Sequence, residues 1–136
     1  YDARLFSGLF VGGLALARGL TPFGERVRDL RRAHGVNQKE MARDLQISAA
    51  YLSALERGKR GRPSPILVDQ ICGYFYIIWD EADALRRLAK LSHPRVVIDT
   101  SQCEAEATEL ANRLAEKITK LPLGKVKKML DLMTDA

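Results

Sequence analysis

The residues with the clearest chemistry are the basic side chains between positions 21 and 63. This segment holds ten Lys and Arg against five Asp and Glu, a net charge of +5 that equals the formal net charge of the whole chain. The flanking segments are nearly balanced, at +1 for 1–20, −1 for 64–100 and 0 for 101–136. A cationic excess confined to one segment is the electrostatic footprint expected for binding phosphate groups.

Side chains that support catalysis or metal binding form no recognisable site in this sequence. Cys72 and Cys103 are too few for a disulfide framework, so we expect free thiols in a reducing compartment. His34 and His93 stand apart from them and from each other, so no metal site is expected. The acidic cluster at 80–83 lies at the start of an expected helix, where the helix dipole favours negative charge. With no nucleophile–base pair and no phosphate-binding loop, the sequence predicts neither enzymatic activity nor a cofactor.

The segment between Asn37 and Gly58 has the capping residues and periodicity of two short helices. Asn37 is a good N-cap, and Glu40 three residues later completes a capping box. Ser48 provides a second N-cap, and Gly58 ends the second helix. The expected apolar faces consist of Met41, Ala42, Leu45, Leu52 and Leu55. Two capped helices joined by a turn of about four residues predict a helix-turn-helix.

Three further helices are expected around this motif. The first begins at Thr21-Pro22 and ends at Gly35, with Phe23, Val27 and Leu30 on its apolar face. The second begins at Ser64-Pro65 and ends near residue 75, and the third runs from about Asp80 to the residue before His93-Pro94. Their expected inward positions are Ile66, Leu67, Ile71, Cys72, Ala84, Leu85, Leu88 and Leu91. Residues 77–79 between them are expected to form a buried hinge. The sequence thus predicts an all-α fold with a five-helix core.

Residues 101–136 are predicted to form a C-terminal helical hairpin that mediates dimerisation. Ser101 and Glu104 suggest a capping box, and Pro122 suggests the start of the last helix. Apolar residues then recur at spacings of three and four, as in coiled-coil seams. The seam consists of Ala107, Ala111, Leu114, Ile118, Leu121, Leu123, Val126, Leu130 and Met133. A stripe this narrow has to be covered by a partner copy or by the core, and we favour a partner copy. Residues 93–100 before it are expected to be a linker, within which residues 95–100 could instead form a short strand that pairs across a dimer.

Residues 21–91 resemble the lambda-repressor-like domain of the XRE (Cro and phage-repressor) family of bacterial and phage transcriptional regulators. The resemblance covers about half of the chain, and the basic loop after the second helix of the motif is in its place. It is carried by Arg31 before Gly35, by residues 36–42, by Ile47-Ser48, by residues 51–53 and by residues 55–59. The resemblance implies that residues 21–92 bind double-stranded DNA, without a metal or cofactor.

The resemblance also implies a role for individual residues. The helix at 38–45 would cross the DNA backbone, and the helix at about 49–57 would enter the major groove. Arg31 and Glu56 match a partly buried ion pair, which we interpret as structural rather than as a DNA contact. The base-facing positions are matched by Ala49, Ala50, Ser53 and Ala54, with Tyr51 beside them. The backbone contacts are assigned to Gln38, Lys39, Arg57, Lys59, Arg60 and Arg62.

Two departures from the family pattern bear on DNA recognition. Gln46 stands where many relatives have Gly, in a turn that favours positive φ. Ala49, Ala50 and Ala54 replace residues that often donate hydrogen bonds to bases, and alanine offers only contact with thymine methyl groups. Direct readout would therefore depend on Tyr51, Ser53, Gln46 or Arg57, and on DNA shape.

Two functions are consistent with this sequence. The first is a dimeric repressor in the cytoplasm, associated with the nucleoid, that binds a pseudo-palindromic operator. The second is an antitoxin-type protein that regulates its own operon and binds a partner protein through its C-terminal helices. The even charge and regular pattern of 101–136 favour self-association over a disordered neutralising tail.

Residues 1–20 differ in composition from the rest of the chain. The apolar run from Leu5 to Ala17 is shorter than the roughly twenty residues of a transmembrane helix, so no membrane association is expected. Residues 15–17 imitate a signal-peptidase site, but a signal peptide would remove the protein from its DNA. We therefore expect an N-terminal arm, or a translated upstream or vector-derived segment.

Overall fold

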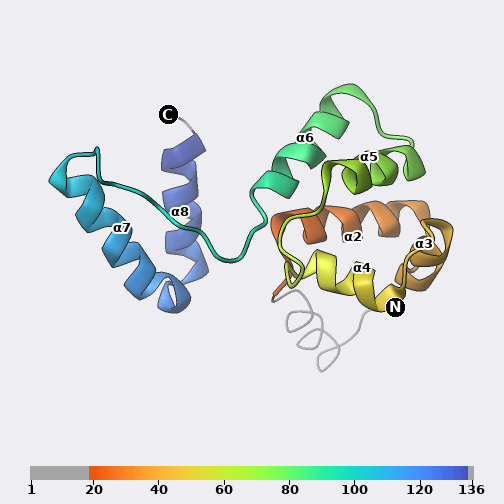
Figure 1. Ribbon diagram of the computed structural model, residues 1–136, viewed down its shortest axis with the longest axis horizontal. Coiled ribbons are helices and arrows are strands. Elements are labelled where there is room, and N and C mark those ends of the chain that lie inside the picture. Colours follow the sequence, from red (N-terminus) through yellow and green to blue (C-terminus); the bar gives the residue numbers. More distant parts are fainter. Residues whose placement is uncertain (1–18, 135–136) are drawn as a thin grey trace. The chain divides into compact units, whose positions relative to one another are not determined.

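Five helices surround one apolar core in the first part of the chain. The computed structural model describes residues 19–134, so the expectations for residues 1–18 lie outside the described part. Helix α2 packs against α4 and α6, helix α3 against α4, and α5 against α6 (Figure 1). These helices are α2 (Pro22–His34), α3 (Gln38–Asp44), α4 (Ala49–Glu56), α5 (Pro65–Tyr74) and α6 (Trp79–Lys90). The turn between α3 and α4 makes them the helix-turn-helix that the sequence predicts.

The chain divides into two compact units between Arg95 and Val96. The second unit contains α7 (Ala105–Lys117), a short 3-10 helix (Ile118–Lys120) and α8 (Leu123–Thr134). Residues 19–134 contain helices and no strand, which confirms the all-α fold. Residues 95–100, for which a strand was one of two expectations, form neither a helix nor a strand in this single chain.

Side-chain caps fix where the helices of the first unit begin. The Thr21 hydroxyl accepts a hydrogen bond from the Gly24 amide at 3.0 Å, and Asn37 and Glu40 form the predicted reciprocal capping box. Ser48 and Ser64 cap α4 and α5 in the same way. These groups satisfy amide donors that would otherwise lack partners in the first turn. The predicted starts of these four helices are therefore confirmed.

The capping box predicted at Ser101 and Glu104 is wrong. Glu104 is itself the N-cap of α7, and its side chain makes no capping hydrogen bond. The Ser101 amide instead donates to the Asp99 carboxylate at 2.9 Å, a local turn that competes with helix formation. The helix therefore begins later than the pattern suggests.

The core agrees with the predicted apolar faces of α2, α3 and α4 but differs in α5 and α6. Fully buried side chains from the first three helices include Phe23, Val27, Met41, Leu52 and Leu55. In α5, Val68 is buried and Ile66 is exposed, because the buried row faces α6 through residues 67, 68, 71 and 72. In α6 the buried row is Ala82, Leu85 and Ala89, whereas Ala84 and Leu91 are exposed. Small residues on this face let α6 lie close to its neighbours.

The predicted buried hinge at residues 77–79 is also wrong in two of its three positions. Ile77 is buried, but Ile78 and Trp79 are 63% and 79% exposed. Tyr76 and Trp79 have φ values of 56° and 53°, which turn the chain back on itself before α6. The turn directs one side chain of the apolar run inward, so hydropathy alone does not predict its burial.

A buried serine fixes the end of α6 against the start of α2. The Ser92 hydroxyl accepts a hydrogen bond from the Phe23 amide at 2.9 Å and donates one to the Leu88 carbonyl at 2.5 Å. Ser92 is buried, so both bonds lie in a region of low dielectric constant. The bond to Phe23 joins residues 69 positions apart and holds together the two ends of the five-helix unit.

Candidate nucleic-acid interface

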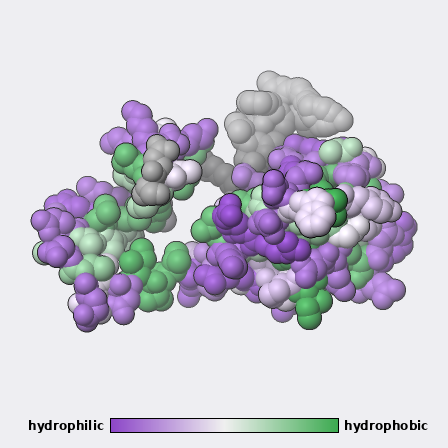
Figure 2. All heavy atoms as spheres, turned by 90° about the horizontal axis from the view of Figure 1, so that it is seen from above, coloured by the Kyte–Doolittle hydropathy of each residue, from purple (hydrophilic) through white to green (hydrophobic). Residues whose placement is uncertain are grey.

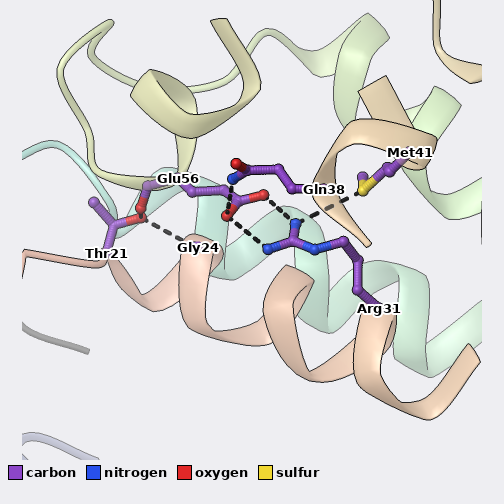
Figure 3. A network of polar contacts seen from close by, with 6 residues as sticks. All are labelled: Thr21, Gly24, Arg31, Gln38, Met41 and Glu56. Carbon is purple, nitrogen blue, oxygen red and sulfur yellow. Dashed lines mark hydrogen bonds and ion pairs between the residues drawn. The ribbon is translucent and has the colours of Figure 1, made fainter. Parts of the chain in front are cut away.

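The last residue of α4, Glu56, joins three helices of the first unit (Figure 3). Its carboxylate accepts hydrogen bonds from both terminal nitrogens of Arg31 in α2, one of them at 3.0 Å, and the pair is buried. The Gln38 amide group, at the start of α3, donates to the same carboxylate at 3.2 Å. The Arg31 guanidinium also contacts the Met41 sulfur at 3.8 Å. Arg31 and Glu56 thus form the ion pair implied by the family resemblance.

The Glu56 backbone carbonyl holds the beginning of α2. It accepts hydrogen bonds from the Thr21 amide at 3.0 Å and from the Thr21 hydroxyl at 3.1 Å. A Cβ atom placed on Gly24 would lie 2.1 Å from this carbonyl oxygen, so only glycine fits where α2 meets α4. Backbone and side-chain contacts of one residue thereby set the position of α4 relative to α2 and α3.

Replacing Gly24 by Ala is expected to destabilise the protein, because the new methyl group has to displace backbone rather than a flexible side chain. We expect the free energy of unfolding to fall by about 1–3 kcal/mol or more. The matched control is Gly73→Ala in α5, where a Cβ would meet nothing within 4 Å. It is expected to raise stability by up to about 1 kcal/mol, because alanine favours the helix. Urea unfolding measures both changes, and a loss no larger for Gly24→Ala than for Gly73→Ala would contradict the close approach.

The turn between α3 and α4 has the backbone conformation expected from the family pattern. Gln46 has a φ of 60°, in the left-handed region that glycine adopts most readily. The Ile47 amide donates to the Ala42 carbonyl at 2.9 Å and closes the turn. The turn therefore places a non-glycine residue in the left-handed region, which costs about 1–2 kcal/mol of conformational free energy.

The predicted base-facing positions of α4 present few polar groups to solvent. Ala49 is half-buried and packs against the core, whereas Ala50 and Tyr51 are exposed. Ser53 and Ala54 are half-buried. Of these five predicted base-facing residues, only Tyr51 and Ser53 have side chains that form hydrogen bonds.

A loop with two left-handed glycines carries the basic residues that follow α4. Gly58 and Gly61 have φ values of 75° and 74°, and the Gly61 amide donates to the Gly58 carbonyl at 3.0 Å. Lys59, Arg60 and Arg62 are exposed. The loop therefore displays three cations on a defined backbone.

Arg60 links the basic loop to α4. Its guanidinium lies 5.5 Å from the centre of the Tyr51 ring, within the range of a cation–π contact. The sequence assigned Arg60 to the backbone-contacting residues and Tyr51 to the base-facing ones, and nothing in the spacing indicated their contact. The cation–π contact thus joins a predicted backbone-contacting residue to a predicted base-facing one.

The remaining predicted backbone contacts lie in or beside the helix-turn-helix. Lys39 is exposed in the first turn of α3, and Arg57 is half-buried at the end of α4. Gln38 is half-buried, and its side chain is bonded to Glu56. If Gln38 contacts a phosphate, its side-chain amide group has to serve both that phosphate and Glu56, which positions α3.

A second polar contact missed by the sequence joins α3 to α5. The Tyr74 hydroxyl donates a hydrogen bond to the Asp44 carboxylate at 2.7 Å. Burial and this hydrogen bond raise the pKa of Tyr74 to about 12, so the phenol stays protonated near neutral pH. No short-range motif connects residues 30 positions apart, and only the tertiary fold brings them together.

Residues 19–134 form neither a metal-binding cluster nor a membrane-spanning helix. No group of three or more His, Cys, Asp and Glu side chains there has an arrangement suited to a metal ion. Cys72 is a buried free thiol and Cys103 an exposed one, and burial raises the pKa of Cys72. Within the same range, no helix has the length and apolar character needed to cross a bilayer.

The arrangement of α2–α6 defines a helix-turn-helix domain, and comparisons with known proteins agree. Residues 22–75 match a family model described as a helix-turn-helix domain. Over 61 residues the chain is 33% identical to an uncharacterized HTH-type transcriptional regulator, RghRB, of Bacillus subtilis (strain 168). That match covers 45% of this chain and 44% of the relative. No solved structure matches the chain significantly. Residues 22–75 are thus similar to helix-turn-helix domains, and the chain spans less than half of this relative's length.

Proposed function

We propose that the protein is a transcriptional regulator that binds double-stranded DNA with α4 in the major groove. The observation that carries the proposal is that the exposed first turn of α4 is close to the cationic loop that follows the end of the same helix. Ala50 and Tyr51 lie at the start of α4, and Lys59, Arg60 and Arg62 follow its end. A helix flanked by cations fits the major groove and the phosphates beside it.

Sequence readout by this surface rests on few side chains. Tyr51 and Ser53 offer hydroxyl groups, whereas Ala50 offers a methyl group suited to thymine. The Arg60–Tyr51 stack restrains both side chains before DNA is bound, which lowers the entropy cost of ordering them. We propose that phosphate contacts supply most of the affinity and that DNA shape supplements direct readout.

A selection from random duplexes tests this function. The whole chain is used to enrich duplexes, and affinity for the enriched and a shuffled duplex of equal composition is measured by fluorescence anisotropy. We expect the enriched duplex to bind at least about 10³-fold more tightly, the lower end for specific regulators. Equal affinity for the two duplexes would contradict a sequence-specific regulator.

We further propose that the second unit forms a homodimer and that the protein acts as a repressor on a two-fold-related operator. Its predicted seam contains half-buried residues such as Leu114 and Leu121 and exposed ones such as Leu130 and Met133, at 58% and 68%. Figure 2 shows hydrophobic residues at the surface of this unit between hydrophilic ones. No residue of α7 or α8 is fully buried, so a two-helix hairpin of this kind gains stability from covering the seam.

Leu130→Lys is expected to convert the dimer to a monomer, because it places a charge in the proposed seam. Sedimentation velocity of the whole chain measures the change. Leu132→Lys is the matched control: it lies on the same helix, is 76% exposed and is outside the seam, so the dimer should persist. The antitoxin-type alternative would be favoured by a different result. In that case the unsubstituted chain is monomeric and co-purifies with a different protein, and Leu130→Lys releases that protein.

A further inference from the structure

A groove between α5 and α6 lies outside the surface assigned to the bases. Its volume is about 510 Å³, within the roughly 300–1,000 Å³ typical of small-molecule sites. One wall is formed by the end of the basic loop and the first turns of α5, and the other by the last turns of α6. The two helices pack side by side (Figure 1).

The floor of the groove is apolar and its rim is cationic. Pro63, Val68 and Ala89 line it and are buried. Arg62 and Lys90 line it from opposite walls and are exposed. A ligand that fits both features has an apolar body and a negative charge.

The charges around the groove favour an anion rather than a cation. Arg86 and Asp69 also line it, but the Arg86 guanidinium is bonded to the Asp69 carboxylate at 3.1 Å and to Asp83 at 2.9 Å. Arg86 thus offsets part of the negative charge of Asp69, which it shares with Asp83. Within residues 19–134, no ion pair engages Arg62 or Lys90, so two cations remain available to a ligand.

We propose that this groove binds a small amphipathic organic anion, with its acid group between Arg62 and Lys90 and its apolar part over Val68 and Ala89. A carboxylate is well suited to the guanidinium of Arg62, which offers paired donors. A bare phosphate fits less well, because most of the groove surface is apolar and would remain uncovered.

Binding at this groove would regulate DNA binding through Arg62, and this part rests on the proposed function. Arg62 is one of the three loop cations assigned to the DNA backbone. An anion bound to it competes with phosphate, so the ligand and DNA each weaken the other's binding by the same factor. The groove thus provides a site for an effector that releases the regulator from DNA.

Octanoate is the test probe. It is titrated into the ¹⁵N-labelled whole chain up to about 10 mM, because a dissociation constant in the millimolar range is expected for so small a ligand. We expect saturable shifts of the Val68, Asp69 and Ala89 amides. The uncharged analogue octanamide should bind at least about tenfold more weakly, as expected for loss of a charge-assisted contact. Equal binding of the two probes, shifts centred elsewhere, or no saturation would overturn the site.

Two lysine variants separate the groove from the DNA surface. Lys90→Ala should weaken octanoate by about tenfold or more without loss of DNA affinity. Lys59→Ala should weaken DNA binding and leave octanoate unchanged, because Lys59 does not line the groove. An octanoate affinity that is insensitive to Lys90→Ala, with an unperturbed spectrum for the variant, would overturn the proposed contact.

DNA anisotropy with and without octanoate then tests the regulation. We expect octanoate to weaken DNA binding by the parent and to have a smaller effect on Lys90→Ala. Octanoate binding that leaves DNA affinity unchanged would overturn the competition at Arg62. Absence of DNA binding without octanoate would instead contradict the proposed function, and the octanoate titration would still decide the site.

Discussion

Replacing Glu56 by Ala is expected to lower the free energy of unfolding by about 3–5 kcal/mol. The substitution leaves the buried Arg31 guanidinium without its carboxylate, and it also removes the acceptor of the Gln38 amide. A charge left unpaired in a region of low dielectric constant costs several kcal/mol. Urea unfolding followed by circular dichroism measures the loss.

Two controls distinguish the buried pair from a general effect of charge. Glu81→Ala breaks an exposed ion pair with Arg26, 3.4 Å apart, and should cost at most about 1 kcal/mol. Replacing Arg31 and Glu56 together by Met and Leu should recover much of the stability, since no unpaired charge remains. If Glu56→Ala cost no more than Glu81→Ala, the assigned role of Glu56 would be wrong.

Replacing Lys59, Arg60 and Arg62 together by Ala is expected to weaken DNA binding by up to about 500-fold at about 0.1 M salt. The estimate assumes that each cation contacts one phosphate. Each such contact contributes about 0.9 to the slope of log K against log salt concentration. The slope itself should fall by up to about 2.7. Fluorescence anisotropy at several salt concentrations gives both values, and the loss should be similar for enriched and shuffled duplexes.

The chain offers a control with the same loss of charge. Lys125, Lys127 and Lys128 are exposed on α8, and their replacement by Ala also removes three positive charges. Affinity and slope should change little, because these lysines lie in the second unit. Equal effects of the two triple substitutions would mean that overall charge, and not the basic loop, sets the affinity.

Local patterns in the sequence were sufficient to predict the frame of the first unit. The capping residues Thr21, Asn37, Ser48 and Ser64 act within three residues of chain, so their spacing is visible without the fold. The positive φ of Gln46 follows equally from the family pattern of the turn. These predictions succeed because the interactions that decide them join residues close together in the sequence.

Contacts between distant residues required the structure. Glu56 bonds to Thr21, Arg31 and Gln38, and only its pairing with Arg31 was implied by the resemblance. Gly24, a glycine inside a helix, is a sequence feature that is consistent with a close backbone approach to α2, but only the structure identifies the Glu56 carbonyl as its neighbour. The exposure of Trp79 was mispredicted because hydropathy does not report the turn before α6.

The central claim is that α4 reads DNA sequence, and parallel selections from one random duplex library test it most directly. The parent, Ser53→Ala and Tyr51→Ala chains are each used for enrichment under the same salt conditions. We predict that each variant loses preference at a base position conserved in the parent's enriched sites, because each loses a hydroxyl group presented by α4. Enriched sites that are identical for all three chains would contradict the placement of α4 in the groove.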